Sequence, residues 1–221
     1  MTVEALISLS TPPLRSNDTI EHALGLLMEL RVRHLPVVSK ASKLEGILSE
    51  EQMLDAEGPE TEVSSLLGAE PIFVLPDAHV FEVTRVMLDS DLTTIPVLDA
   101  ENKYIGLVRR HDLFEWFARM LGTQEPGAIL ALEVDERDYV LSQIIYSIEQ
   151  SDIKVLSVST ERSPLNSEQL NITLKLNTTD ASRVRFLLEH HGYKVIAAFG
   201  AEDDDEELAD RVQEFMRYLE V

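Results

Sequence analysis

The sequence predicts an α/β (α+β) protein of two parts: a duplicated unit of two helices and two strands, and a domain with the element order βαββαβ. Three observations support this prediction. They are an internal repeat in the first half, a linker containing glycine and proline near residue 125, and alternating strand and helix patterns in the second half. With 221 residues, of which 44% are hydrophobic, the chain is long enough to bury substantial cores.

An internal repeat with a period of sixty residues organises the first part of the chain. Residues 34–38 (HLPVV) return as residues 94–98 (TIPVL), and residues 46–48 (GIL) return as residues 106–108 (GLV). The apolar positions of a predicted helix follow the same shift, with Ile20, Ala23, Leu26 and Leu27 corresponding to Val80, Val83, Val86 and Met87. Because all these features share one shift, we expect both copies to have the same structure.

Each copy is expected to form a helix, two strands and a second helix. Turn and cap residues at 17–19 (NDT) and 76–77 (PD) precede the first helix of each copy. The proline of the first strand lacks an N–H group and belongs at a strand start or edge. A short strand at 73–75 leads into the second copy. Its second helix carries an apolar stripe of Leu113, Trp116, Phe117, Met120 and Leu121.

A strand with proline followed by a glycine strand that runs into a helix resembles the CBS (cystathionine-β-synthase) domain. Two copies in tandem resemble a CBS-domain pair, or Bateman module, over residues 1–121, with repeat one at about 1–60 and repeat two at about 61–121. The resemblance implies clefts between the repeats, which in many members bind adenosine nucleotides, and face-to-face dimerisation. The ligands it implies here are AMP, ADP, ATP or S-adenosylmethionine.

The family's ligand motif follows the glycine strand, with a Ser or Thr for phosphate and, three residues later, an Asp for ribose. The second repeat keeps Asp112 and places Arg109 at the hydroxyl position, followed by Arg110 and His111. Such a basic cluster in an acidic chain could hold a phosphate through charge-assisted hydrogen bonds. Alternatively, these side chains pair with neighbouring carboxylates, and Asp112 simply suits the first turn of a helix.

The resemblance adds further residues to this site and implies a weaker second one. Arg33 and His34 occupy positions where family members contact base or phosphate across the cleft, and Thr94 is the counterpart of His34 in repeat two. In the first repeat Ser49 keeps the hydroxyl, but Gln52 replaces the Asp. Ser49 and Gln52 also fit a capping box at a helix start, which is the alternative interpretation.

The second part begins after a linker at residues 122–127 (GTQEPG). Strands are predicted at 128–134, 153–160, 170–177 and 193–199, and helices at 139–150 and 180–191, the second capped by Thr179 or Asp180 and ended by Gly192. This order is the ferredoxin-like arrangement. Over residues 128–200 it resembles an ACT domain, a module that often binds amino acids at dimer interfaces.

Ligand-binding ACT domains usually carry a glycine in the turn after the first strand, where this chain has residues 135–138 (DERD). We therefore expect a dimerising role rather than amino-acid binding. The combined architecture resembles that of the acetoin-utilisation B-type proteins.

Residues 201–221 are predicted to form an amphipathic terminal helix. An acidic run at 202–207 precedes apolar residues at helical spacing, namely Leu208, Val212, Phe215 and Leu219. A Ca²⁺ or Mg²⁺ site is the alternative for the acidic run, although it lacks the glycine and loop of an EF-hand.

Composition excludes several classes of function. The net charge of −21, from 19 basic and 40 acidic residues, argues against binding to nucleic acids or anionic membranes. Without cysteine the chain has neither disulfides nor thiolate metal sites. The sequence also lacks an apolar run of membrane-spanning length and a basic leader, which predicts a cytoplasmic protein.

These features predict a non-catalytic regulatory protein, because no metal-ligand spacing or catalytic motif is found. We expect a homodimer that binds a small ligand and acts on an unidentified target protein. Three hypotheses remain: a nucleotide sensor, a ligand-free interaction scaffold, and an amino-acid or metal-ion sensor that works through the ACT-like part.

Overall fold

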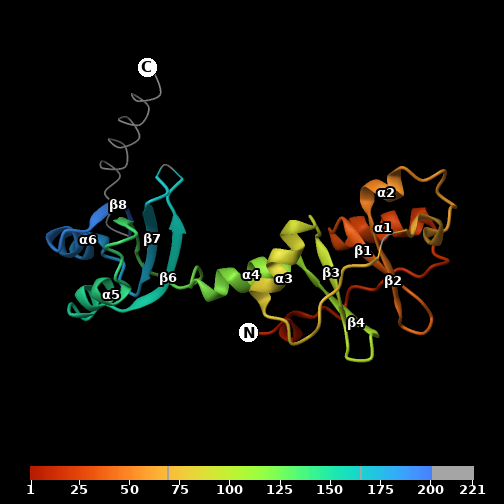
Figure 1. Ribbon diagram of the computed structural model, residues 1–221, viewed down its shortest axis with the longest axis horizontal. Helices are drawn as coiled ribbons and strands as arrows, with labels where there is room; N and C mark the ends of the chain where they lie inside the picture. Colours follow the sequence, from red (N-terminus) through yellow and green to blue (C-terminus); the bar gives the residue numbers. More distant parts are fainter. Residues whose placement is uncertain (69, 165, 201–221) are drawn as a thin grey trace, which may run out of the picture. The chain divides into compact units, whose positions relative to one another are not determined.

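The structure is a computed structural model that describes residues 1–68, 70–164 and 166–200 (Figure 1). The predicted helix at 201–221 lies outside these residues. The chain divides after Trp116 into two compact units, and each is described by itself. None of the helices in the described part of the chain combines the length and the apolar composition needed to cross a membrane.

The first unit contains the predicted element order twice. The first repeat consists of α1 (Ile20–Leu30), β1 (His34–Val38), β2 (Leu44–Ser49) and α2 (Glu50–Leu54). The second consists of α3 (Val80–Asp89), β3 (Thr94–Leu98), β4 (Tyr104–Arg109) and α4 (Arg110–Met120), which continues past the end of the unit. Short 3₁₀ helices, η1 (Val3–Leu6) and η2 (Val63–Leu66), precede the two repeats.

The caps of the two first helices differ. The Thr19 side chain accepts a hydrogen bond from the His22 N–H at the start of α1, as the sequence predicts. At α3 the cap is His79, whose ring accepts from the Phe81 N–H at 3.2 Å, and not the predicted Pro76-Asp77 pair. Those two residues lie in the turn before the helix, so the cap is formed further along the chain.

The strands pair in the same way in both repeats. β1 and β2 are antiparallel, with Val37 opposite Gly46, and β3 and β4 are antiparallel, with Val97 opposite Gly106. The register shifts after Val37 in one hairpin and after Val97 in the other. The sixty-residue repeat of the sequence is therefore also a repeat of strand register.

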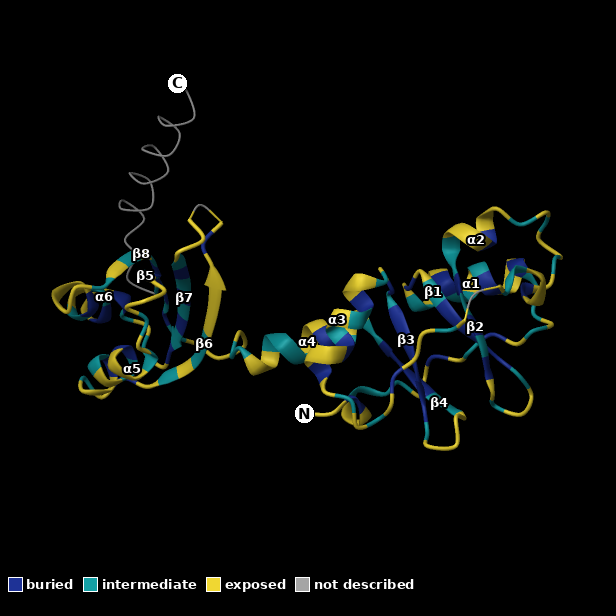
Figure 2. Cartoon of the chain, viewed as in Figure 1, coloured by how far each residue is buried: buried dark blue, intermediate teal, exposed yellow. Residues whose placement is uncertain are grey.

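The leading segment of each repeat packs in the core of the other repeat. We define the leading segments as residues 1–9 and 61–68. The Val3 N–H donates to the Ala78 carbonyl at 3.0 Å, and the Val63 N–H donates to the Asp18 carbonyl at 2.9 Å. Val3 belongs to the core of repeat two and Val63 to that of repeat one, and both are fully buried. Each repeat is therefore completed by its neighbour, and Figure 2 shows the buried residues following the strands β1–β4.

The second unit is a four-stranded antiparallel sheet with two helices. Its elements are β5 (Ile129–Asp135), α5 (Leu141–Glu149), β6 (Val155–Arg162), β7 (Gln169–Leu176), α6 (Ala181–His190) and β8 (Lys194–Phe199). The strand order β6-β7-β5-β8 with these connections is the ferredoxin-like topology. The predicted alternation in β7 is confirmed, because Leu170, Ile172, Leu174 and Leu176 are all buried.

The structure fixes the start of α6 and moves the end of β6 from where the sequence predicts it. The Asp180 carboxylate caps α6 by accepting from the N–H groups of Ser182 and Arg183, so Asp180 and not Thr179 is the cap. Strand β6 extends to Arg162, into a segment that the sequence predicts as loop. It extends because Arg162 pairs with Leu170 of β7 and its guanidinium forms an ion pair with Glu136 at 2.8 Å.

Candidate functional site

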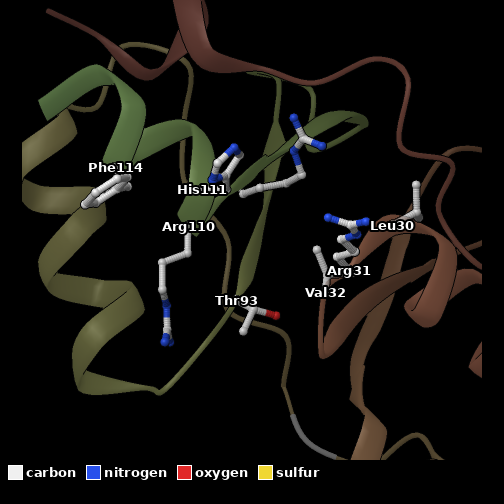
Figure 3. Close-up of a pocket in the computed structure, with 8 residues that line it drawn as sticks. Leu30, Arg31, Val32, Thr93, Arg110, His111 and Phe114 are labelled. Atoms are coloured by element: carbon white, nitrogen blue, oxygen red, sulfur yellow. The ribbon is translucent and has the colours of Figure 1, made fainter. Parts of the chain in front are cut away.

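A cleft of about 580 Å³ lies between the two repeats of the first unit (Figure 3). The first repeat contributes the end of α1 and the residues before β1, which are Leu30, Arg31 and Val32. The second repeat contributes Thr93 and the segment that joins β4 to α4, namely Arg109, Arg110, His111 and Phe114. Four cationic or titratable side chains and three apolar ones therefore surround one space.

Hydrogen bonds between the repeats form the seam beside this cleft. The Thr93 N–H donates to Nδ1 of His34 at 3.2 Å, and the Thr93 hydroxyl accepts from the Arg33 N–H at 2.9 Å. The Thr94 hydroxyl donates to the His34 carbonyl at 2.8 Å and is completely buried. His34 and Thr94, which the sequence nominates as ligand residues, thus connect β1 to β3 and do not line the cleft.

The electrostatic state of His34 follows from this seam. Its Nδ1 accepts a backbone hydrogen bond, which requires the neutral ring with the proton on Nε2. Burial lowers the pKa of His34, Asp91 opposes the change, and the cationic Arg33 and Arg110 lower the pKa further. The seam is therefore built around an uncharged imidazole.

Arg109 and Asp112 form a two-pronged ion pair. Nε of Arg109 donates to one carboxylate oxygen at 2.9 Å and Nη2 donates to the other at 2.6 Å. The hydrogen bonds to Asp112 raise the pKa of Arg109. Asp112 thus faces Arg109 and is not among the residues that line the cleft, while Arg109 is. The pairing is the alternative that the sequence left open, and it orients the guanidinium at the cleft wall.

The next two basic side chains of the motif are also paired. Arg110 donates to the Asp91 carboxylate at 3.0 Å and to the Leu92 carbonyl at 2.7 Å, and the hydrogen bond from Arg110 lowers the pKa of Asp91. Nε2 of His111 lies 3.0 Å from the Glu115 carboxylate. The cluster therefore carries its own counter-charges.

Arg31 lies on the opposite wall and differs from the other basic residues. Figure 3 shows its side chain directed toward the space between the repeats, across from Arg110 and His111. It follows α1 in the left-handed backbone conformation, with φ 54° and ψ 42°. Across the described residues, no carboxylate lies within ion-pair distance of its guanidinium.

The structure places the predicted residues unevenly. Arg109 and Arg110 line the cleft, whereas Arg33 is exposed and pairs with Glu50 at 3.4 Å. Sequence reasoning did not find Arg31, Thr93 or Phe114 as site residues. Arg31 stands five positions before the strand proline, but its left-handed conformation is not visible in the sequence.

Ser49 and Gln52, the residues of the weaker second site, form a capping box with each other. The Ser49 hydroxyl accepts from the Gln52 N–H at 3.1 Å, and the Gln52 side chain accepts from the Ser49 N–H at 2.9 Å. Both side chains stabilise the start of α2, which confirms the structural interpretation of this pair.

Comparison with known families identifies the repeats. A family model of the CBS domain matches the chain twice, over residues 4–58 and 63–119, which together make up half of the chain. The two matches coincide with the two repeats described above.

Related sequences contain the same segment within much longer chains. The chain is 28% identical over 104 residues to a homoserine O-acetyltransferase of Methanosarcina acetivorans, a match that covers 47% of this chain and 19% of that protein. It is 29% identical over 106 residues to the magnesium transporter MgtE of Thermus thermophilus, covering 46% of this chain and 23% of the transporter. The chain thus spans less than a quarter of the length of these two relatives.

Solved structures show the same fold. A candidate acetoin utilization protein (AcuB) from Vibrio cholerae aligns with a TM-score of 0.51 at 25% identity, covering 56% of this chain and 95% of that one. A CBS domain pair/ACT domain protein from Thermotoga maritima aligns with a TM-score of 0.50 at 20% identity, covering 55% and 99%. Both alignments cover little more than half of the present chain.

Proposed function

The chain belongs to the CBS-domain family, and from this premise we propose that its first unit is a regulatory module that binds an adenosine nucleotide in the cleft between the repeats. The observation that carries the proposal is the cleft itself. It gathers Arg31, Arg109, Arg110 and His111 in a chain whose net charge is −21. A basic site in so acidic a protein selects a small anion and excludes a long polyanion such as DNA.

The chemistry of the cleft matches a nucleotide in two respects. Guanidinium groups bind phosphate oxygens through two parallel hydrogen bonds, and Arg109 is already oriented by Asp112. Leu30, Val32 and the exposed ring of Phe114 supply apolar surface that a purine base can cover. AMP, ADP, ATP and S-adenosylmethionine are the candidate ligands, and the phosphate compounds fit the cationic walls better.

Binding in this cleft would act on the arrangement of the repeats. Its walls come from both repeats, and Arg110 also joins the start of α4 to the segment between α3 and β3 through Asp91 and the Leu92 carbonyl. A ligand that draws Arg110 away changes that connection. Such a ligand regulates only if its affinity differs between two arrangements of the module.

The rest of the chain fits a regulatory role. We propose a CBS pair at residues 1–121, an ACT-like dimerisation domain at 128–200 and a tail at 201–221, in a cytoplasmic homodimer that acts on a target protein. A cavity of about 400 Å³ in the second unit is bordered by Glu133, Asp135 and Asp138. Lys194 and His191 also border it, but Lys194 is paired with Glu133, so the remaining carboxylates disfavour the carboxylate of a free amino acid, and sensing of amino acids by this unit is the weaker alternative.

A thermal-shift series tests the proposed function. AMP, ADP, ATP and S-adenosylmethionine are each added to the wild-type protein, to Arg109→Ala and to Asp112→Ala. A ligand at one hundred times its Kd stabilises the folded protein by about 2.7 kcal/mol, which raises the melting temperature by several degrees. We expect this rise with an adenosine phosphate in the wild type and its loss in both variants.

Arg137→Ala is the matched control, because it removes the same charge from the second unit, outside the cleft. It should retain the full shift. A wild-type protein that melts at one temperature with every compound would favour the ligand-free scaffold and contradict the proposed function. A shift that survives both cleft substitutions would move the site elsewhere.

A further inference from the structure

We propose that Arg31 is the primary anion anchor of the cleft, and that it limits each CBS pair to one anionic ligand. The proposal rests on the proposed function for the place of binding, but not for the identity of the ligand.

The backbone at Arg31 is held where arginine is unfavourable. A φ of 54° lies in the left-handed region, where a side chain crowds the backbone and glycine, asparagine and aspartate are preferred. The equivalent position of the second repeat obeys this preference, since Asp91 has a φ of 47°. An arginine that breaks the local rule, and whose side chain points into a cleft, indicates a function for that side chain.

Arg31 also differs from the other basic residues of the cleft in the pairing of its charge. Arg109 is held by Asp112, Arg110 by Asp91, and His111 lies beside Glu115. These carboxylates orient the two arginines and the histidine of the second repeat, and they also offset part of the attraction of these side chains for an anion. Within the described ranges the Arg31 side chain has no such carboxylate, and its exposed guanidinium can reorient toward a ligand at little cost.

The symmetry of the pair explains why one anion is expected and not two. The residue sixty positions after Arg31 is Asp91. The same shift relates Arg110 to Glu50 and His111 to Glu51. Three of the four basic positions of the cleft thus have acidic equivalents, whose charge Arg33 offsets only at Glu50, and this excess of negative charge disfavours a second anion there.

The test replaces residues of repeat one that have a left-handed backbone by asparagine, which suits this conformation. Arg31→Asn removes the charge and suits the left-handed backbone. Ser42→Asn is the matched control, because Ser42 is also left-handed with a φ of 62°, lies outside the cleft, and has Asn102 as its equivalent. Arg31→Lys keeps the charge. Binding of ATP and of tripolyphosphate is measured by calorimetry, and melting temperatures are measured without ligand.

We expect Arg31→Asn to melt about 2–4 °C above the wild type, because backbone strain is relieved. It should bind both probes at least about tenfold more weakly, as expected for the loss of a hydrogen bond to a charged group. Ser42→Asn should also melt higher but keep wild-type affinity, and Arg31→Lys should retain most of the affinity. The wild type should bind one ATP per chain.

The outcomes separate this inference from the proposed function. Equal affinities of the wild type and Arg31→Asn, in a protein that binds ATP, would overturn the anchor and leave the proposed function standing. Binding of tripolyphosphate that depends on Arg31, without any binding of ATP, would support the anchor and contradict the nucleotide. Two ATP molecules per chain would overturn the limit to one ligand, and a wild type that binds neither probe would overturn both proposals.

Discussion

His34 connects the two repeats through its ring and through its backbone. The ring accepts from the Thr93 N–H, and the backbone carbonyl accepts from the Thr94 hydroxyl. Protonation of the ring would remove the acceptor and place a positive charge near Arg33 and Arg110, with Asp91 as the opposing charge. We therefore expect this residue to make the contact between the repeats sensitive to pH.

We predict that the stability of the protein falls as the pH is lowered through about 6.5, and that His34→Asn reduces this fall. The pKa of His34 in the folded state lies below its ordinary value, so the unfolded chain binds the proton first. The stability lost to this residue therefore begins near the unfolded pKa and stops growing below the folded one. Urea unfolding at a series of pH values between 7.5 and 5.5 measures the slope.

The choice of asparagine keeps the hydrogen bond, because its Oδ1 can replace Nδ1 as acceptor for the Thr93 N–H. Asparagine keeps the acceptor but does not titrate, so the variant changes protonation and keeps the hydrogen bond. The other histidines are the same in both proteins and contribute equally to the two slopes. Parallel curves for the wild type and His34→Asn would show that His34 does not contribute to the pH dependence.

At the scale of elements, the exchanged leading segments are the main feature of the first unit. Each one covers the glycine strand of the other repeat: Gly106 lies against Ile7 and Ser8, and Gly46 lies against Leu67. The glycines of the repeated motif are therefore explained by close approach of a segment that is distant in sequence. The two glycines nevertheless differ in what they contact: Gly106 lies against backbone, and Gly46 lies against the end of a side chain.

We predict that Gly106→Ala destabilises the protein by about 2–3 kcal/mol and that Gly46→Ala costs about 1 kcal/mol or less. A Cβ at Gly106 would overlap Cγ2 of Ile7 and lie 3.1 Å from the Ser8 carbonyl oxygen, at a φ of 152°. A Cβ at Gly46 would meet only the end of the flexible Leu67 side chain. Urea midpoints of the two variants give the comparison, and equal losses would refute the explanation by backbone approach.

At the scale of the whole molecule, four exposed apolar residues on helices of the first unit follow the sixty-residue repeat. Met28 on α1 corresponds to Leu88 on α3, and Leu54 on α2 corresponds to Phe114 on α4. All four side chains are exposed, from 64% to 77%. Exposed apolar surface that recurs by symmetry supports self-association through these helices, which is the homodimer we propose.

We predict that the double variant Met28→Glu/Leu88→Glu weakens the dimer at least tenfold, because each chain would bury two charges at the contact. Light scattering coupled to gel filtration over a range of concentrations measures the dissociation. Leu9→Glu is the control, since Leu9 is 82% exposed but lies in a leading segment and not on a helix. A dimer that resists the double variant and dissociates with Phe186→Glu would show that the proposed ACT-like domain alone carries the contact, and would contradict a contact through the helices of the first unit.

Local patterns in the sequence predicted most of the elements. The sixty-residue shift predicted both copies of the first unit, and period-two alternation predicted β7, because these patterns are set by which side of an element meets the core. Errors occur at element ends, such as the cap at His79 and the length of β6. The end of β6 depends on a partner strand and an ion pair from elsewhere in the chain, whereas the cap of α3 depends on which side chain reaches the free N–H groups.

The candidate site was predicted only in part. The motif at Arg109 and Asp112 was visible, but its role depends on a choice between partners that the sequence leaves open. The structure pairs the two side chains, moves His34 and Thr94 into the seam, and brings Arg31 to the cleft from a different repeat. By itself the sequence determined the family, the duplicated elements and the excess of negative charge, because each is a property of neighbouring residues or of composition. Only the tertiary structure decided which leading segment completes which repeat and which cation remains available to a ligand, because both depend on contacts between residues far apart in the chain.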